Sequence, residues 1–199
     1  MVIMKRAEMT RQRILDCACD LFYRQGYQAT TVDQVIDATG ISKPTLYKHF
    51  PSKEALATAY LKRRKAAELG ALRERLAAIH DVRERFAEAA VFVRDALPAN
   101  NFRGCAFFNM VSEIPDRSDP VVGVVLSFVD EFRAIIRELA EEVKAGEPAC
   151  SGIDAITVAE DYYVLVCGAI MASQELHRID PADRAVERVK ALLPAQRVA

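Results

Sequence analysis

The amino-terminal third of the chain spaces its apolar residues as short amphipathic helices do. A first helix is expected from Thr10 to the break at Gly26, because apolar residues recur every three or four positions between them. The apolar positions of this helix are Ile14, Leu15, Ala18, Leu21 and Phe22. The sequence contains no strand-like alternation of any length, so the pattern predicts an all-α protein.

Two shorter helices are expected next, joined by a tight turn. Thr31 and Gln34 have the spacing of a capping box, in which each side chain bonds the other residue's backbone at the start of a helix. Gly40 supplies the left-handed position that ends this helix. Ser42 can then cap a third helix, and Pro44 lies in its first turn, where a missing N–H has no cost. This arrangement is a helix-turn-helix.

The remainder of the sequence predicts six further helices. A long helix capped by Ser52 runs to about Ile79. Loops rich in Gly, Pro, Asn and Asp separate the next helices, which are expected at residues 82–97, 105–114, 121–143, 154–177 and 182–193. The total is about nine helices. We expect residues 1–51 to form a three-helix helix-turn-helix domain and residues 52–199 to form a helical bundle.

The expected helix at residues 154–177 is apolar nearly all round in its middle. A helix with no solvent-facing side must be covered on several sides, and the last two helices of a chain of this size cannot both lie at its centre. Pairing with a second copy through the helices at 154–177 and 182–193 would cover it; the alternative is the central core helix of a monomer. The longest apolar run, Tyr162 to Ala172, is too short for a bilayer, so we expect no membrane association.

The expected third helix turns most of its surface away from its own core. At 100° per residue, Leu46 and Phe50 share one side. The opposite and flanking positions carry Pro44, Thr45, Tyr47, Lys48 and His49. Such a face is commonly just solvated. This one, however, follows a capped helix and a glycine turn, and its helix has two apolar residues, just enough to dock it against the rest of the domain. We therefore interpret it as a surface that reads DNA.

The chemistry of this surface suits the major groove of DNA. Lys43 and Lys48 can donate to guanine O6 and N7, and Thr45 can bond other base edges. Pro44 can contact a thymine methyl group. Hydroxyl, imidazole and ammonium groups around the helix can reach phosphates. The candidate DNA contacts are Thr31, Ser42, Lys43, Pro44, Thr45, Tyr47, Lys48, His49 and Lys53. One such helix reads few bases, so a homodimer on a pseudo-palindromic double-stranded DNA operator is expected.

Charge is distributed unevenly along the chain, which the formal net charge of -1 conceals. Residues 1–53 hold eight Lys and Arg against five acidic residues, an excess of three, and the rest of the chain carries a net charge of -4. Residues 1–53, the head, are mildly basic, and the remaining residues, the body, are acidic. This distribution fits a polyanionic partner for the head.

The cysteines indicate a reducing environment. Their number, five, is odd, and most of them lie in expected helices, so they do not suggest a disulfide framework. The amino terminus has a basic pair but no long apolar run after it, so no signal peptide is expected. A cytoplasmic protein is the expectation that follows.

The segment TTVDQVIDATGISKPTLYKHFPSKEAL, residues 30–56, resembles the DNA-binding segment of the TetR family of transcriptional regulators. In that family the recognition helix typically ends in a Tyr-x-x-Phe pattern, followed by a Lys at the start of the next helix. Tyr47, Phe50 and Lys53 match it. Residues 103–116, RGCAFFNMVSEIPD, are similar to a segment of some members. The resemblance implies three DNA-binding helices, a ligand-binding body, a homodimer built from the last two helices, and the DNA contacts given above other than Ser42.

The body carries a candidate site for a small-molecule effector. Asn109 and Glu113 are four residues apart on one face of an expected helix rich in Phe, Met and Cys. If that face points inward, an amide and a carboxylate would orient a ligand; if it points outward, both are solvated. The resemblance favours a pocket, whose candidate residues are Phe86, Cys105, Phe108, Asn109, Glu113 and Phe128. Binding there would release a repressor from its operator by shifting a two-state equilibrium.

Two other interpretations stay open at this point. Cys105 lies near Arg103 at an expected helix start, a setting that reactive thiols use, so a regulator that senses oxidants or electrophiles is one alternative. Cys105 is otherwise a small buried apolar residue. A helical adaptor that binds an acidic protein through the basic head is the second alternative.

An enzyme is not expected. The sequence has no Gly-rich phosphate loop, no G-x-S-x-G motif and no H-E-x-x-H motif, and its three histidines lie apart from one another without a clustered carboxylate. We therefore expect no catalytic residues, no metal ligands and no cofactor.

Overall fold

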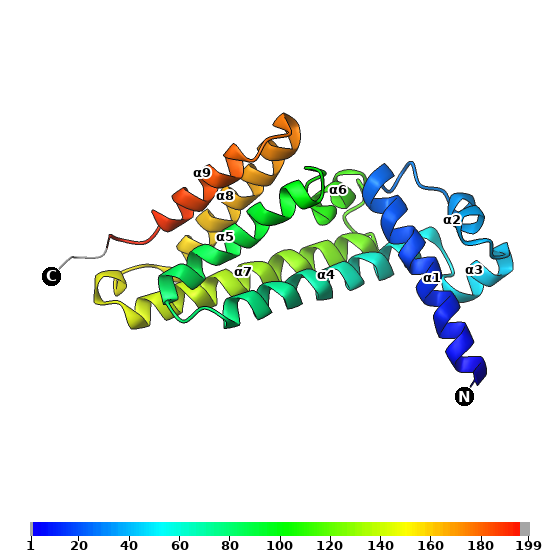
Figure 1. Ribbon diagram of the computed structural model, residues 1–199, viewed down its shortest axis with the longest axis horizontal. Coiled ribbons are helices and arrows are strands. Elements are labelled where there is room, and N and C mark those ends of the chain that lie inside the picture. The colour runs from blue at the N-terminus through cyan, green and yellow to red at the C-terminus, as the bar shows by residue number, and fades with distance from the viewer. Residues whose placement is uncertain (1, 196–199) are drawn as a thin grey trace. The chain divides into compact units, whose positions relative to one another are not determined.

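The computed structural model describes residues 2–195 and the side chains of residues 6–195 (Figure 1). Within that part of the chain there are nine α-helices, one short 3₁₀ helix and no strand. The elements are α1 (Val2–Gln25), α2 (Val32–Thr39), α3 (Lys43–His49), α4 (Lys53–Ala77), α5 (Val82–Ala99), α6 (Ala106–Ser112), α7 (Pro120–Gly146), the 3₁₀ helix η1 (Pro148–Cys150), α8 (Ala155–Leu176) and α9 (Asp180–Lys190). The predicted all-α class is confirmed. The outer ends of the two predicted domains, residue 1 and residues 196–199, lie outside the described residues.

Two helix ends differ from the prediction for identifiable reasons. The first helix, α1, begins at Val2 instead of Thr10, since residues 2–9 contain neither Gly nor Pro and most of them favour helices. The apolar periodicity does not extend into those residues, so it could not mark them. Helix α6 ends at Ser112 instead of residue 114, because the residue before Pro115 is disfavoured in the helical conformation.

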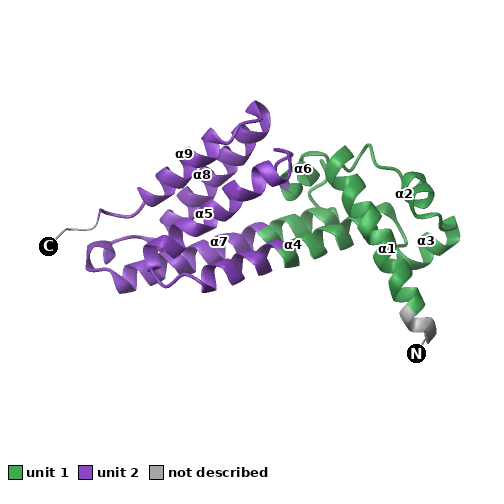
Figure 2. Cartoon of the chain, in the orientation of Figure 1, with its two compact units in different colours: residues 1–67, 106–128 green, residues 68–105, 129–199 purple. Residues whose placement is uncertain are grey.

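The chain divides into two compact units (Figure 2). Unit 1 comprises residues 1–67 and 106–128, which hold α1 to α3, the first part of α4, α6 and the start of α7. Unit 2 comprises residues 68–105 and 129–199, which hold the rest of α4 and α7 together with α5, η1, α8 and α9. The functional division between residues 51 and 52 is a different kind of boundary and stays a prediction.

The core of unit 1 contains the apolar face predicted for the first helix. The ring of Phe22 on α1 lies 5.8 Å from that of Tyr60 on α4, centroid to centroid. Buried core side chains of α1 to α4 in this unit include Ile14, Leu15, Ala18, Phe22, Val35, Leu46, Phe50, Leu56, Tyr60 and Leu61. Burial of one large apolar side chain contributes about 1.5–3 kcal/mol, so these residues hold the small helices in place.

Helix α6 and the start of α7 complete unit 1. Phe107 of α6 is fully buried, and its ring stacks on that of Phe128 of α7 with the centroids 3.8 Å apart. Lys65 Nζ of α4 donates to Ser127 Oγ of α7 at 2.6 Å. Two segments distant in sequence from the first three helices therefore belong to the same packed unit.

Two hydrogen bonds join the residue after α6 to the loop between α1 and α2. The backbone N–H of Gln28 donates to Glu113 Oε2 at 2.6 Å, and Gln28 Nε2 donates to the Glu113 carbonyl oxygen at 3.0 Å. We call these two bonds the Glu113 clasp. Gly26 lies beside the clasp with a φ of 95°, and a Cβ added there would come within 2.5 Å of Glu113 Oε1. Both the left-handed backbone and the close carboxylate favour glycine at this position.

Unit 2 is built around α5, α8 and α9, which pack against one another. Tyr162 of α8 is fully buried, and its ring meets the ring of Phe86 on α5 edge-on at a centroid distance of 5.1 Å. The Tyr162 hydroxyl donates to the Phe86 carbonyl oxygen at 3.0 Å, which satisfies a polar group in the interior.

Helix α8 is long and apolar enough, by length and composition, to cross a membrane. The helix meets this criterion as a whole because further residues of α8 extend the short apolar run from Tyr162 to Ala172 on both sides. The interior helix of a packed domain meets the same criterion, and here α8 packs against α5 and α9.

Gly26→Ala is expected to destabilise the protein more than the matched Gly40→Ala. Both glycines have a positive φ, 95° and 64°, so alanine adds about 1–2 kcal/mol of backbone strain at each. A Cβ at Gly40 meets nothing within 4 Å, whereas a Cβ at Gly26 displaces the Glu113 carboxylate. We expect Gly26→Ala to lower the free energy of unfolding by about 1 kcal/mol more, as measured in urea.

A Glu113→Ala background provides the control for this comparison. Removal of the carboxylate removes the atoms nearest to the new Cβ, so the difference between the two glycine substitutions should shrink by about 1 kcal/mol. A difference of unchanged size in this background would show that the Glu113 carboxylate is not its cause.

Candidate DNA-binding interface

Helix α2 begins and ends as its sequence predicts. Thr31 is the N-cap, with its hydroxyl accepting from the backbone N–H of Gln34 at 3.2 Å, and Gln34 Oε1 accepts from the Thr31 N–H at 2.7 Å. Gly40 ends the helix with a φ of 64° and donates its N–H to the Ile36 carbonyl at 2.8 Å. The capping box and the glycine turn are both confirmed.

Helix α3 is short, and its sequence fixes both ends. Ser42 is the N-cap, and its Oγ accepts from the backbone N–H of Thr45 at 3.3 Å, while Pro44 lies in the first turn. Phe50 is the C-cap and donates its N–H to the Leu46 carbonyl at 2.9 Å. The helix is therefore limited to seven residues.

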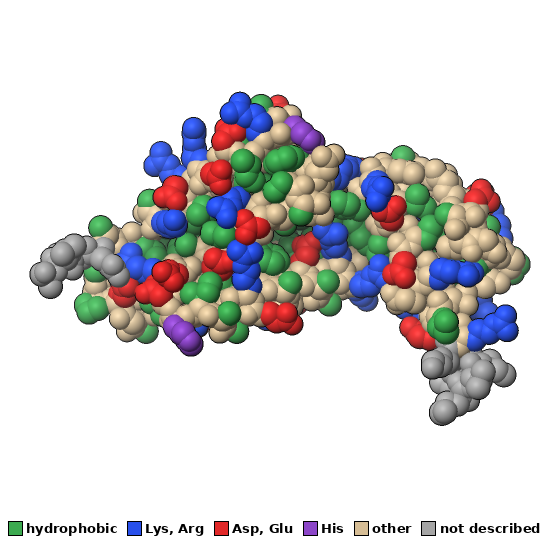
Figure 3. Space-filling view, viewed as in Figure 1, with side chains coloured by type: hydrophobic (Ala, Val, Ile, Leu, Met, Phe, Trp, Pro, Cys, Tyr) green, Lys and Arg blue, Asp and Glu red, His purple; other side chains and the backbone are tan. Residues whose placement is uncertain are grey.

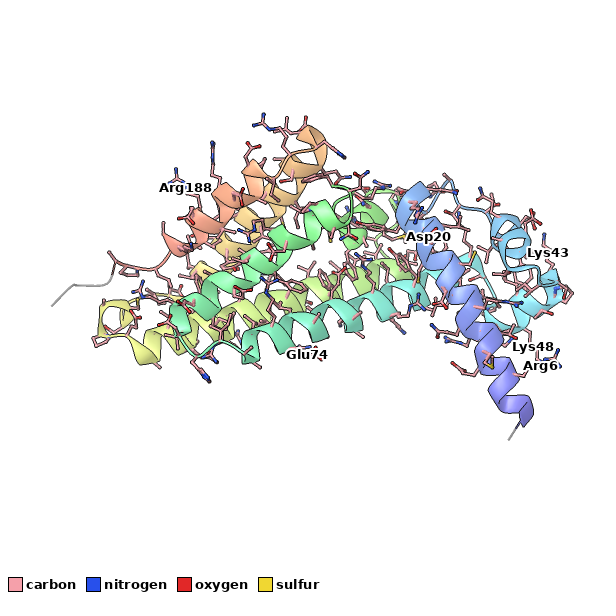
Figure 4. All side chains as sticks on the ribbon, in the orientation of Figure 1. Arg6, Asp20, Lys43, Lys48, Glu74 and Arg188 are labelled. Carbon is pink, nitrogen blue, oxygen red and sulfur yellow. The ribbon has the colours of Figure 1, made fainter. Side chains whose placement is uncertain are left out.

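Only one side of α3 faces the core of unit 1. Leu46 and Phe50 are 0% and 2% exposed, and the guanidinium carbon of Arg11 on α1 lies 4.9 Å from the centroid of the Phe50 ring. Tyr47, by contrast, is 41% exposed. We call the exposed or half-buried side chains of α3 the reading face; they are Lys43, Pro44, Thr45, Tyr47, Lys48 and His49. Figure 4 shows Lys43 and Lys48 at the two ends of this helix.

The end of the reading face at Lys43 is engaged by an acidic residue that the sequence reasoning missed. Lys43 Nζ donates to Asp33 Oδ1 of α2 at 3.0 Å. This hydrogen bond raises the pKa of Lys43 above its ordinary value, so the ammonium form is favoured. The two residues are ten apart on different helices, so no helical spacing could have indicated the pair. Basic and acidic side chains both lie on the surface of this unit (Figure 3).

Lys53 lies at the start of α4 and is half-buried. Its Nζ donates to the Gln28 carbonyl at 3.4 Å and lies 4.5 Å from the centroid of the Tyr27 ring. Burial lowers the pKa of Lys53 below its ordinary value, against the opposing effect of the Glu113 carboxylate. Lys53 therefore supports the loop between α1 and α2, and a phosphate contact by Lys53 stays a prediction.

The six candidate effector residues divide between the two units. Unit 2 holds Phe86 and Cys105, whereas unit 1 holds Phe108, Asn109, Glu113 and Phe128. The predicted common helical face of Asn109 and Glu113 is wrong, because α6 ends at Ser112 and Glu113 forms the clasp with Gln28. Two of these phenylalanines pack against other aromatic rings, Phe86 against Tyr162 and Phe128 against Phe107. An effector site made by these residues stays a prediction.

Cys105 directly precedes α6 and is half-buried. Tyr163 of α8 lies close to it and forms a hydrogen bond with Cys167. Burial raises the pKa of the Tyr163 hydroxyl and of the Cys167 thiol. All five cysteines are free thiols, and sensing through Cys105 stays a prediction.

Comparison with known proteins agrees with this geometry. Residues 14–60 match the model of bacterial regulatory proteins of the tetR family, and residues 72–189, more than half of the chain, match the tetracyclin repressor-like C-terminal domain. The chain is 29% identical to the transcriptional repressor ComR of Escherichia coli strain K12 over 178 residues, 83% of this chain and 80% of ComR. It is 32% identical to the regulator RutR of Escherichia coli O157:H7 over 142 residues, 70% of this chain and 64% of RutR.

A solved structure supports the same assignment. The fold is similar to that of a TetR-family transcriptional regulator from Streptomyces coelicolor, with a TM-score of 0.82 and 25% identity, covering 92% of this chain and 87% of that one. The chain therefore belongs to the TetR family, and it is a transcriptional regulator with a DNA-binding helix-turn-helix rather than an enzyme.

Proposed function

We propose that this protein is a ligand-responsive repressor that binds a pseudo-palindromic operator as a homodimer. The observation that carries the proposal is the reading face. Helix α3 is docked through two buried residues, Leu46 and Phe50, and leaves its other side chains exposed or half-buried. A capped helix that presents donors in this way fits the major groove of DNA. The relative ComR is named a repressor, which supports repression as the action of this protein on transcription.

The reading face divides by chemistry into base and phosphate contacts. Lys43, Thr45 and Lys48 have donors suited to base edges, and Pro44 offers an apolar surface for a thymine methyl group. Tyr47 and the groups around the helix suit phosphates, which fix the register of the protein on DNA. The proposed phosphate contacts are Thr31, Ser42, Tyr47, His49 and Lys53. Thr31 and Ser42 are exposed N-caps, so the amino-terminal ends of α2 and α3 both present N–H groups to an anion.

A surface of α8 supports the homodimer. Large apolar side chains of this helix remain exposed although the helix packs against α5 and α9; they are Ile156 (56%), Val164 (67%), Met171 (64%) and Leu176 (55%). Val164, Gly168 and Met171 follow the i, i+4, i+7 spacing of one helical face, and the glycine would let a second helix approach closely. A second copy of the chain would cover this stripe from a two-fold axis.

The Glu113 clasp supports a response to a ligand. It joins the end of α6 to the loop that leads into α2, within one compact unit. A ligand that binds better to one position of α6 than to another would therefore change the position of the helix-turn-helix. The response needs only a difference in ligand affinity between the two states of the regulator.

Selection of bound duplexes from a random DNA library tests the proposed function directly. We expect the recovered sequences to form an inverted repeat, because two copies of one reading face related by two-fold symmetry read the same bases on opposite strands. Sequencing of the bound pool reports the symmetry and the half-site spacing. Recovery of a pool with no motif, or of a single half-site, would contradict operator binding by a homodimer.

Substitutions on the reading face and at Lys53 should separate affinity from sequence preference. Tyr47→Ala and Lys53→Ala are expected to weaken binding to all duplexes by similar factors, because phosphates carry no sequence. Lys43→Ala and Thr45→Ala should relax preference at one base pair of each half-site, by about 1–3 kcal/mol per contact. Fluorescence anisotropy with the selected operator and its single-base variants measures both effects.

Arg137→Ala is the control for these four substitutions. It removes one positive charge from the exposed surface of α7 in unit 2, outside the helices expected to form the dimer, and should leave DNA binding unchanged. Wild-type affinity and base preference in the Lys43, Thr45 and Tyr47 variants would exclude α3 as the DNA-binding element.

Charged substitutions in the α8 stripe should prevent dimer formation. Val164→Glu and Met171→Glu each place a carboxylate where the proposed interface excludes water, and a buried unpaired charge costs several kcal/mol. We expect monomers in sedimentation velocity experiments and weak binding to a full operator. Leu126→Glu, at an exposed leucine of α7 (55%), is the control and should stay dimeric. Dimers in both α8 variants would exclude this stripe as the interface.

A further inference from the structure

An acidic side chain lies where the protein is proposed to meet a polyanion. Asp33 is in the first turn of α2, and its Oδ1 atom lies 3.0 Å from Lys43 Nζ at the start of α3. The side chains of Asp33 and Lys43 are 69% and 57% exposed. The carboxylate therefore lies at the same surface as the reading face, and its partner is one of the candidate base-reading groups.

The ion pair is not needed to hold α2 and α3 together. An exposed ion pair contributes little to stability, because water screens the charges and two long side chains lose conformational freedom. The buried side chains of Val35 and Leu46 and the left-handed turn at Gly40 already fix the two helices. The position of Asp33 is therefore better explained by recognition than by folding.

The carboxylate has opposite effects on the two kinds of DNA contact. It repels phosphate oxygens, and it occupies Lys43, so a phosphate must compete for that ammonium. An ammonium has three N–H donors, so Lys43 can keep its bond to Asp33 and still donate to guanine O6 or N7. Asp33 therefore disfavours contacts to phosphates, which carry no sequence information, and leaves the contacts of Lys43 to bases available.

We propose that Asp33 is a specificity-determining residue, which holds Lys43 for base edges and lowers binding to DNA without the operator sequence. The proposal rests on the proposed function, since it assumes that α3 reads DNA. Asp33 acts through its charge and through its bond to Lys43. The first effect should depend on salt concentration, and the second should depend on the presence of Lys43.

Asp33→Asn, compared with Asp37→Asn, tests the proposal. The amide keeps the size of the side chain and removes its charge. Asp37 lies one turn further along α2, is also exposed, and forms no ion pair within the described residues, so it controls for the loss of one negative charge. Binding to the selected operator and to a scrambled duplex is measured by fluorescence anisotropy over a range of salt concentrations, after urea unfolding has verified that both variants are folded.

The two variants should differ in specificity. We expect Asp33→Asn to bind the scrambled duplex about fivefold more tightly than wild type, the factor for about one unit-charge interaction at 4 Å in water. Its operator affinity should change less, so the ratio of the two affinities falls. The salt dependence of binding to the scrambled duplex should become steeper by about one phosphate contact, because Lys43 is released to phosphates. Asp37→Asn should change both affinities by the same smaller factor.

A Lys43→Ala background separates the action through Lys43 from a general effect of charge. In this background Asp33→Asn should change specificity no more than Asp37→Asn does. If Asp33→Asn matches Asp37→Asn in the wild-type background while the wild type binds its operator, only the role of Asp33 is overturned. If the wild type binds operator and scrambled duplex alike at every salt concentration, the proposed operator recognition is overturned as well.

Discussion

Docking of α3 by Leu46 and Phe50 is the interaction on which the rest of the DNA-binding surface depends. A helix of seven residues is not stable by itself, because the cost of helix nucleation exceeds what so few hydrogen bonds return. Caps at Ser42 and Phe50 satisfy its ends, but only the two buried side chains fix its orientation. The other side chains of the helix thereby lie at the surface.

The same unit that contains the helix-turn-helix also contains α6 and the start of α7. This has a physical basis in the Glu113 clasp and in the stacked rings of Phe107 and Phe128. Glu113, a candidate effector residue, holds the loop before α2 through its bonds with Gln28. The residue following α6 thus has a structural role close to the DNA-binding helices, which connects the family's two sequence segments, residues 14–60 and 72–189.

Two of the positively charged side chains in this unit already have partners within the protein. Lys43 pairs with Asp33, and Lys53 bonds the Gln28 carbonyl beside the Tyr27 ring. A count of basic residues in the first 53 positions therefore overstates the charge that is available to a polyanion. Lys48 lies at the other end of α3 from Lys43 and is exposed, so the two lysines of the reading face are not equivalent.

The sequence by itself determined the features that depend on local physics. The capping box of Thr31 and Gln34, the turn at Gly40, the cap at Ser42 and the inward side of α3 all follow from residues within four positions of one another. The all-α class and the family follow from the same local patterns, as does the order of the helices.

Only the tertiary structure decided which distant residues meet. Gln28 and Glu113 are 85 positions apart, and Asp33 and Lys43 are ten apart on two helices, so helical periodicity carries no information about either pair. Because α6 ends at Ser112, Glu113 does not lie on the helical face predicted for it. Periodicity shows which side of a helix is buried, whereas the partner of each side chain is set by how the helices pack.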